Sequence, residues 1–511
     1  MNEQTELPDH WERIPVADFA ELISGQHILS DDYHQEPDDG GTPYLTGPAD
    51  FGDDYPEVSK WTHKPKAMAQ EGDVLLTVKG ANVGKTNVLD INEAAISRQL
   101  MAIRPKTALS KYIYYYFRNN FSAFQRLGAG STVPGIDQES VLGFEVPLPP
   151  LPEQRRIVAK IEELFTNLDA GQSDLATAER QLERYRLSVL QAAVEGRLTA
   201  DWRRTHDPEH ADQLLERILE ERREKWEERY KWERYESKGK EPPSGWKDRY
   251  TKPDPPDETD LRELPQCWKW SRLGHAFFVH LGATPRRSRD DFWGGDIAWA
   301  SSSEINQREI THTEESITEA GLEDTSTQVL PPGTLMLGMI GQGRTRGMVA
   351  ELKIPAATSQ NSAAIEVAHS SVPPKWVYYY LESQYHELRR MGSGNNQKAL
   401  NKGIVQEIPI PLPPLAEQKQ IVDEVERLLS VADDAAATAE REQTRAERLR
   451  QSILKQSFSG RLVPHVEDAA PPQVDGSVSE GPDSDSSDGT GSDVEDLLGS
   501  ADSSKQIEMD L

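Results

Sequence analysis

The longest regular pattern of apolar positions in this chain occurs twice. After residues 147–154 (Pro-Leu-Pro-Pro-Leu-Pro-Glu-Gln), apolar side chains recur in alternating steps of three and four over about five heptads. A run of the same length follows residues 411–418, although Glu442 interrupts its spacing. This pattern predicts two long helices that pair along a coiled-coil seam. The seam residues that it assigns are Ile157, Ile161, Leu164, Leu168, Leu175, Leu182 and Val189 in the first copy and Ile421, Val425, Leu428, Leu449 and Ile453 in the second.

Both predicted helices begin after prolines and end at Gly-Arg-Leu, at residues 196–198 and 460–462. The copies are offset by 264 residues at both ends (411 against 147, and 460 against 196), so they form a repeat without gaps. At about 1.5 Å per residue, each helix would be roughly 60 Å long. Small residues near mid-span, such as Gly171 and Ala439, are expected to let the two helices approach closely. The alternative is that each helix packs separately on its own domain.

The blocks that precede the two helices repeat the same landmarks. The offset drifts from 257 to 264 along the blocks, which indicates one fold with loop insertions. The landmarks are an opening Leu-Pro-x-x-Trp (7–11 and 264–268), an apolar strand after a glycine (72–78 and 333–337) and three tyrosines in a predicted helix (114–116 and 378–380). We therefore predict an α+β architecture with duplicated domains at 1–150 and 263–414, long helices at 151–199 and 415–462, a charged helical linker at 200–262 and an acidic disordered tail at 463–511.

The charge of the chain complicates any prediction of nucleic-acid binding. Its net charge is −29, of which 13 acidic residues and one lysine within 466–511 contribute −12. Two interpretations stay open, namely adaptation to high salt and a function that does not involve DNA. The single cysteine, Cys267, excludes disulfides within the chain. Because no signal peptide and no apolar run of roughly eighteen residues is found, we expect a soluble, cytoplasmic protein.

Two short motifs resemble enzyme signatures, but neither matches its pattern. Residues 80–86 (GANVGKT) resemble a phosphate-binding loop with three instead of four residues between the glycines, so a polar hairpin loop is the better interpretation. Residues 254–257 (DPPD) lack the aromatic residue of the amino-methyltransferase signature. Paired acids with a lysine at nuclease spacing, a HExxH motif and a Ser/His/Asp arrangement are also missing. We therefore predict no catalytic residue and no metal ligand.

Basic and amide residues gather in corresponding loops of the two blocks. Arginine reads guanine, and asparagine or glutamine reads adenine, through paired hydrogen bonds in the major groove, whereas lysine and hydroxyl groups more often hold phosphates. The alternative is that these are ordinary polar loops. The candidate DNA-binding residues are Lys79, Asn82, Lys85, Thr86, Arg98, Gln99, Arg126, Ser131 and Thr132 in the first block and Arg286, Arg287, Arg344, Arg346, Gln360, Asn361, Asn395, Asn396, Gln397 and Lys398 in the second.

Taken together, these motifs resemble the specificity subunit of type I restriction-modification systems. The resemblance rests on Pro-Leu-Pro-Pro-Leu-x-Glu-Gln followed by 155–158 (RRIV) and 419–422 (KQIV), on both Gly-Arg-Leu endings and on the block openings, and it covers about residues 7–462. It implies a pseudo-two-fold protein in which an antiparallel pair of the family's conserved helices separates two target-recognition domains. Each domain would read one half of a split double-stranded DNA sequence, and the helix length would set the unread gap.

The resemblance also implies partners and a role without catalysis. Members of the family bind two methyltransferase subunits, chiefly through the helices, and restriction subunits join that complex. S-adenosylmethionine, ATP and Mg²⁺ belong to those partners, so this chain is expected to bind no cofactor itself. The acidity and the tail depart from the family pattern and bear on the salt range of DNA binding. A competing hypothesis is a coiled-coil scaffold with two peptide-binding domains and no role with DNA.

Overall fold

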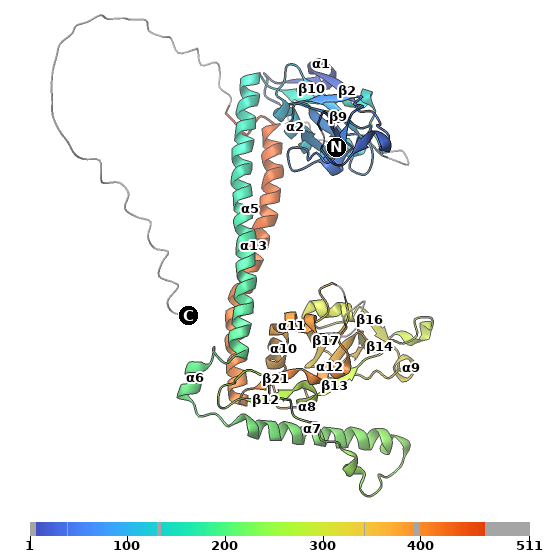
Figure 1. Cartoon of the computed structure of the whole chain (residues 1–511), viewed down its shortest axis with the longest axis vertical. Helices are drawn as coiled ribbons and strands as arrows, with labels where there is room; N and C mark the ends of the chain where they lie inside the picture. Colours follow the sequence, from blue (N-terminus) through green and yellow to red (C-terminus); the bar gives the residue numbers. More distant parts are fainter. Residues whose placement is uncertain (1–6, 38, 130–133, 342, 392–398, 465–511) are drawn as a thin grey trace, which may run out of the picture. The chain divides into compact units, whose positions relative to one another are not determined.

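The structure, a computed structural model, describes residues 7–464 apart from 38, 130–133, 342 and 392–398. The predicted disordered tail lies outside the described residues, except for its first two positions. Within the described part, no helix combines the length and the apolar character needed to cross a membrane. The elements of the two domains and the two long helices are labelled in Figure 1.

The first domain consists of two sheets and a short closing ribbon. One sheet has the strand order β2-β10-β7-β8, the other has the order β3-β5-β4-β9-β6, and β1 pairs with β11. The strands are β1 (Glu12–Pro15), β2 (Ala20–Ser24), β3 (Tyr33–His34), β4 (Thr42–Leu45), β5 (Trp61–Thr62), β6 (Met68–Gln70), β7 (Val74–Thr77), β8 (Thr86–Val88), β9 (Glu93–Ile96), β10 (Leu100–Pro105) and β11 (Glu145–Leu148). The helices are α1 (Val16–Phe19), α2 (Ser110–Asn119), α3 (Phe121–Leu127) and α4 (Gln138–Leu142).

The second domain repeats this plan with a longer first sheet and a shorter second one. Its sheets have the orders β13-β20-β17-β18-β15 and β16-β14-β19, and β12 pairs with β21. The strands are β12 (Lys269–Arg272), β13 (Phe278–Leu281), β14 (Trp293–Ala300), β15 (Glu309–Ile310), β16 (Glu315–Ile317), β17 (Thr334–Gly338), β18 (Val349–Leu352), β19 (Ala357–Thr358), β20 (Ser362–Glu366) and β21 (Pro409–Leu412). The helices are α8 (Leu273–Ala276), α9 (Glu319–Glu323), α10 (Pro374–Ser383), α11 (Tyr385–Arg390) and α12 (Lys402–Glu407).

The core strands form where the sequence predicts them, but the tyrosine helix is broken. Every residue of β7 is buried, as its continuous apolar sequence requires. One helix is predicted over residues 111–124, whereas the structure has α2 and α3 with Asn120 between them. The Asn120 side-chain amide donates to the Tyr116 carbonyl at 2.9 Å and thereby ends α2. The predicted single helix is therefore wrong at this point.

The two long helices are α5 (Leu151–Val194) and α13 (Leu415–Ser457). Each ends at a glycine with positive φ, namely Gly196 at 73° and Gly460 at 71°. The Arg197 amide donates to the Ala192 carbonyl and the Gly196 amide donates to the Ala193 carbonyl, which is a Schellman cap. A Cβ at Gly196 would also lie 3.0 Å or less from Trp268, Pro265 and Arg203. These contacts explain the repeated Gly-Arg-Leu ending.

The two helices contact each other along an antiparallel, pseudo-two-fold seam (Figure 1). Arg186 of α5 pairs with Asp433 of α13, and Arg450 of α13 pairs with Asp169 of α5. In this exchange, each residue has its copy 264 positions along the chain. Such reciprocal contacts define a two-fold interface. The predicted antiparallel pairing is therefore confirmed.

The seam is less buried at its middle than the pattern predicts. Ile157, Ile161, Val189, Ile421 and Val425 are buried, and all of them lie toward the helix ends. The remaining predicted seam residues are half-buried, apart from Leu449, which is 42% exposed. The prediction for Gly171 is wrong, because a Cβ at that position would meet no atom within 4 Å. The ends are buried because the domains cover them, whereas the middle has only the facing helix.

The repeated sequence motifs contact each other across long stretches of chain. In the first copy, Glu153 accepts hydrogen bonds from Trp11 at 3.3 Å and from His10 at 2.8 Å. In the second copy, the buried Glu417 accepts from Trp268 at 2.9 Å and from Thr199 and Arg203. The tryptophan of each domain opening is thus tied to the glutamate that begins the following helix.

The linker between α5 and the second domain packs on that domain. It contains α6 (Ala200–Thr205) and α7 (Ala211–Arg234), where a helix over about 212–236 is predicted. Ala211, Leu214 and Ile218 of α7 are buried. Arg229 donates to Glu366 of β20 at 2.8 Å and lies over the Phe278 ring. No counterpart of this helix covers the first domain within the part of the chain that the structure describes.

Candidate nucleic-acid interface

In the first domain, three predicted polar segments come together at one end of the β2-β10-β7-β8 sheet. They are the β7–β8 hairpin, the turn between β9 and β10, and the loop after α3. The Val78 amide donates to the Gln99 carbonyl at 2.8 Å, which joins the hairpin to the turn. The Gly80 amide donates to the Pro134 carbonyl at 2.9 Å, and Lys79 bridges to Gly135. Residues far apart in sequence therefore form one continuous polar edge.

The second domain builds the same edge with the same kinds of hydrogen bond. The Met339 amide donates to the Asn361 carbonyl at 3.0 Å, which joins the β17–β18 hairpin to the turn before β20. The Leu400 amide donates to the Met339 carbonyl at 3.0 Å and brings in the loop before α12. A fourth segment, the loop between β13 and β14, is attached where Ala283 donates to the Thr358 carbonyl at 2.9 Å.

Each hairpin is held against the helix that follows the three tyrosines. Gly84 and Gly347, with φ of 93° and 85°, lie against α3 and α11, and a Cβ at Gly84 would approach Phe124 to 2.8 Å. From equivalent positions 264 apart, the Gln125 side chain donates to the Ala81 and Val83 carbonyls and the Arg389 side chain donates to the Gly343 and Arg346 carbonyls. These braces were not predicted, because only the matched position on the two helices indicates them.

The cations of the first edge mostly project into solvent. Lys79, Asn82, Arg98, Gln99 and Arg126 are exposed. Lys85 is also exposed, and its ammonium group lies 6.0 Å from the centre of the Phe51 ring. Thr86 is 8% exposed, so it contributes mainly to the wall of a cleft. Ser131 and Thr132 lie outside the described residues, so their assignment stays a prediction.

The cations of the second edge mostly have partners within the domain. Arg287 pairs with Glu315, and Arg286 lies 3.6 Å from Asp324. The hydrogen bond from Arg287 lowers the pKa of the Glu315 carboxyl, so that this partner stays ionised near neutral pH. The Gln360 side chain accepts a hydrogen bond from the Thr284 hydroxyl. Residues 395–398 (Asn395, Asn396, Gln397 and Lys398) lie outside the described residues.

Two of the predicted base-reading arginines differ in their freedom. Arg344 is exposed at the hairpin tip, where its carbonyl accepts from the Tyr385 hydroxyl at 2.9 Å. Arg346 is half-buried, and its guanidinium donates to the Arg389 carbonyl at 2.8 Å. Arg344 is therefore placed to reach a ligand, whereas Arg346 helps to hold the hairpin on α11. Whether either residue contacts a base stays a prediction.

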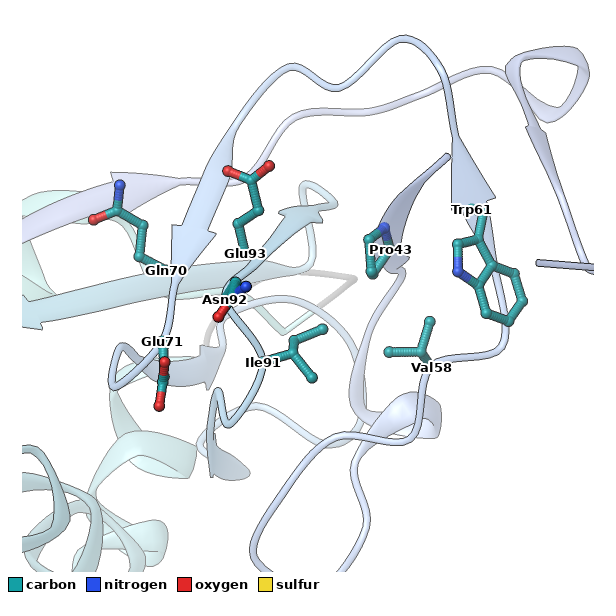
Figure 2. Close-up of a pocket in the computed structure, with 8 residues that line it drawn as sticks. All are labelled: Pro43, Val58, Trp61, Gln70, Glu71, Ile91, Asn92 and Glu93. Carbon is teal, nitrogen blue, oxygen red and sulfur yellow. The ribbon is translucent and has the colours of Figure 1, made fainter. Parts of the chain in front are cut away.

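Two clefts of the first domain differ in their fit to a nucleic acid. The cleft beside the hairpin, of about 500 Å³, is lined by Lys85 and Arg118 together with Asp53, Glu57 and aromatic rings. A cavity of about 810 Å³ lies elsewhere, on the β3-β5-β4-β9-β6 sheet. Figure 2 shows its apolar residues Pro43, Val58, Trp61 and Ile91 beside the polar residues Gln70, Asn92 and Glu93. Because its lining carries Glu71 and Glu93 and no cation, this cavity is unsuited to phosphates.

Within the described residues, no group of three or more His, Cys, Asp or Glu side chains is arranged to hold a metal ion. The hairpin at 77–86 connects two antiparallel strands and not a strand and a helix. The interpretation of GANVGKT as a polar hairpin loop is therefore confirmed. What the two edges offer chemically is hydrogen-bond donors and positive charge on duplicated frames.

A fold with two duplicated domains, each carrying such an edge, and an antiparallel helix pair defines a protein that recognises two separate sites. The family model described as "Type I restriction modification DNA specificity domain" matches residues 8–179 and 265–440. The chain belongs to this family. The expected non-catalytic role is the one that a specificity subunit implies.

Similar proteins cover almost the whole chain. The type I restriction enzyme EcoDI specificity subunit of Escherichia coli is 22% identical over 93% of this chain and 93% of its own length. The MjaVIII specificity subunit of Methanocaldococcus jannaschii is 22% identical over 89% of this chain and 94% of its own. A solved structure from work on complex assembly and conformational transition of the type I R-M system is similar in fold. It has a TM-score of 0.62 and 18% identity over 89% of this chain and 99% of that chain.

Proposed function

We propose that this chain directs a type I restriction-modification complex to a split DNA sequence, with one half read by each domain. The observation that carries the proposal is the common frame of the two polar edges, on which the loop tips differ. Two different half-sites require such an arrangement, because bases are distinguished by the pattern of hydrogen-bond donors and acceptors at their edges. The exposed lysines and arginines of both edges supply the phosphate contacts that position the duplex.

In this proposal, the helix pair sets the number of unread base pairs between the half-sites. At about 1.5 Å per residue, the 44 residues of α5 extend over roughly 66 Å. Inserting one heptad into each helix at corresponding mid-span positions lengthens the pair by about 10 Å, which corresponds to about three base pairs of B-DNA. The half-sites should then stay the same while the gap between them grows.

The helix pair also offers two equivalent apolar grooves for the methyltransferase partners. One groove, of about 600 Å³, is lined by Leu175, Leu182, Tyr185 and Ala439 among others. The other, of about 460 Å³, includes Leu449 and Ala446, which are the copies of Tyr185 and Leu182 at a distance of 264 residues. Pseudo-two-fold symmetry thus gives two similar surfaces on one chain, as expected for two copies of one partner.

The partners supply the chemistry in this proposal. The methyltransferase subunits bring S-adenosylmethionine, the restriction subunits bring ATP and Mg²⁺, and this chain contributes binding alone. A test of stoichiometry uses Tyr185→Glu and Leu449→Glu, which place a charge in one groove each. Native mass spectrometry of the complex should show one methyltransferase lost with either variant and both lost with the double variant. Retention of both partners in the double variant would place the docking surface elsewhere.

The decisive experiment measures adenine methylation in host DNA by long-read sequencing, with the gene present and deleted. Loss of one split motif with a fixed gap supports the proposal and identifies the sequence. If a methyltransferase co-purifies with the chain but no motif depends on the gene, the DNA role is wrong. A scaffold without a DNA role would then account for the helix pair.

A further inference from the structure

One arginine on the second edge is held far more firmly than the other candidate cations. The guanidinium of Arg287 lies 3.9 Å from the centre of the Trp293 ring and 5.3 Å from the centre of the Trp299 ring. Its Nη1 and Nη2 atoms donate to the two carboxylate oxygens of Glu315. Even so, the Arg287 side chain is 55% exposed. It is therefore both fixed in orientation and open to a ligand.

The strand register explains why these groups meet. Trp299 of β14 lies directly opposite Glu315 of β16 in the antiparallel pair, and Trp293 lies opposite Ile317. The two indole rings pack edge to face, with centres 5.2 Å apart. Both indole N–H groups donate to the backbone of the arginine loop, Trp299 to the Ala283 carbonyl at 3.0 Å and Trp293 to the Arg286 carbonyl at 3.3 Å. The sheet thus fixes the loop at both its root and its tip.

The neighbouring arginines lack this support. Arg286 is 70% exposed and has one carboxylate contact at 3.6 Å. Arg289 pairs with Asp291, only two residues further along its own loop. The first domain, in its described residues, has no arginine between β2 and β3 at all. Orientation by a sheet carboxylate and two indoles is therefore specific to Arg287.

We propose that Arg287 reads a guanine in the major groove of the second half-site, with Glu315, Trp293 and Trp299 as its positioning residues. The inference rests on the proposed DNA function. Arginine pairs with guanine O6 and N7 through two parallel N–H groups, which requires a fixed plane and direction of the guanidinium. The donors along the Nε edge of Arg287 are not used by Glu315, so they are available for such a pair. Groups locked by surrounding contacts lose little freedom on binding.

Glu315 has a second effect that distinguishes positioning from simple support. Its negative charge lies at a surface that would face phosphates, so it opposes binding to DNA of any sequence. Replacing it by glutamine removes that repulsion and loosens Arg287 at the same time. We therefore expect Glu315→Gln to bind unrelated duplexes more tightly while its guanine preference falls. A residue that only supports the fold would lower both.

The experiment selects bound sequences from a random duplex library with the full chain in complex with its methyltransferase partner. Arg287→Lys keeps the charge but not the planar fork, so guanine preference at one position of the second half-site should fall roughly tenfold or more. The first half-site should be unchanged, which also shows that the variant is folded. Arg289→Lys is the matched control from the same loop and should retain the full preference.

Three outcomes would overturn the inference, and one of them is separable from the function. If the wild-type complex selects no split sequence, the proposed function fails and this inference fails with it. If it selects one and Arg287→Lys leaves every position of it unchanged, only the assignment of Arg287 is wrong. A uniform loss at all positions would make Arg287 a phosphate contact. A drop in affinity for all duplexes with Glu315→Gln would make Glu315 a structural residue.

Discussion

The two domains share a backbone frame but stabilise it with different charges, and at one place with inverted ones. In the first domain, Arg118 of α2 pairs with Asp54 at 3.0 Å. In the second, Glu382 of α10, which is the copy of Arg118 264 residues along, lies 3.7 Å from Arg308. Asp54 and Arg308 are also equivalent, because their carbonyls accept from the matching amides of β8 and β18. The pair is retained while both of its signs are exchanged.

A second difference concerns what each sheet binds at its buried edge. In the first domain, Arg104 of β10 donates to Asp73 at 2.8 Å. In the second, Glu366 of β20 accepts instead from Arg229 of the linker helix α7 and from His280. The comparison shows that backbone hydrogen bonds and helix caps define the shared skeleton, whereas charged side chains can be replaced as complementary pairs. The loop tips can therefore diverge toward different half-sites without loss of the fold.

The largest expected difference between the domains lies at the two helix-starting glutamates. Glu417 is fully buried and holds Arg203, so Glu417→Ala leaves a largely buried cation without its carboxylate. Removing one partner of such a pair costs about 3–5 kcal/mol of unfolding free energy. Glu153→Ala should cost less, roughly 1–3 kcal/mol, because its partner His10 is 43% exposed. Denaturant unfolding of the full chain measures both, and equal losses would contradict the comparison.

Acid should weaken the second domain before the first. Burial lowers the pKa of His275 and of His369 to about 4. Because these values lie below the ordinary value of 6.5, both histidines favour the folded state above pH 6.5. That contribution, on the order of 2 kcal/mol each, is lost as the pH falls from 6.5 through about 4. Hydrogen exchange of β13 and β20 should therefore accelerate between pH 7 and 5 relative to β2 and β10.

The matched control for this prediction comes from the first domain. None of its described histidines is buried. Replacing His369 by asparagine removes one of the two titrating groups and should reduce the slope of stability against pH for the second domain only. A parallel loss of protection in both domains over the same pH range would show that the effect is global.

The hairpin glycines should give a smaller and more local effect. A Cβ at Gly84 would lie 2.8 Å from the Phe124 Cβ and 3.1 Å from the Phe121 carbonyl, whereas the nearest atom at Gly347 is 3.2 Å away. Alanine at a positive φ is strained at both positions, so each variant should lose about 1–3 kcal/mol, with Gly84→Ala the more affected. Selection on a random duplex library should show each variant losing preference in its own half-site alone.

Gly171→Ala is the control for the glycine variants. It lies within α5, and nothing stands within 4 Å of a Cβ built on it. Alanine should therefore stabilise the helix by about 0.5–1 kcal/mol and leave both half-sites unchanged. Destabilisation by Gly171→Ala would mean that the helices approach more closely at mid-span than the structure shows.

The smallest effect is expected from the inverted ion pair. Arg118 and Asp54 are 40% and 49% exposed, so the pair contributes about 0.5 kcal/mol. Arg118→Glu places two carboxylates together, and adding Asp54→Arg should recover most of the loss by reproducing the arrangement of the second domain. A double-mutant cycle by thermal unfolding measures this coupling. No recovery in the double variant would show that the backbone frames differ at this position.

The sequence predicts the duplicated elements well, because the repeat shows them twice. The two long helices, the hairpin at 77–86 and the linker helix all form close to their predicted bounds. The seam at Leu449 is predicted less well, since periodicity indicates a face but not whether a domain covers it. The break at Asn120 depends on a side-chain hydrogen bond to Tyr116 that spacing does not encode.

The candidate site is predicted in its segments but not in its contacts. The polar loops meet at one edge of each domain, as their positions after equivalent strands indicate. The role of Arg346 in holding α11 follows from where its guanidinium points, which its sequence neighbourhood does not determine. Likewise, Glu315 is joined to Arg287 by the pairing of β14 with β16. Interactions of this kind need the register of strands that are distant in the chain.

The way each long helix ends in the opposite domain also constrains synthesis on the ribosome. Phe458, near the end of α13, packs edge to face on Tyr112 and Tyr116 of the first domain. The first domain thus waits for a segment made about 340 residues later, roughly half a minute at ordinary elongation rates. Until then the aromatic face of α2 is uncovered. A prematurely terminated chain would keep that face exposed, so quality control can distinguish it from the complete chain.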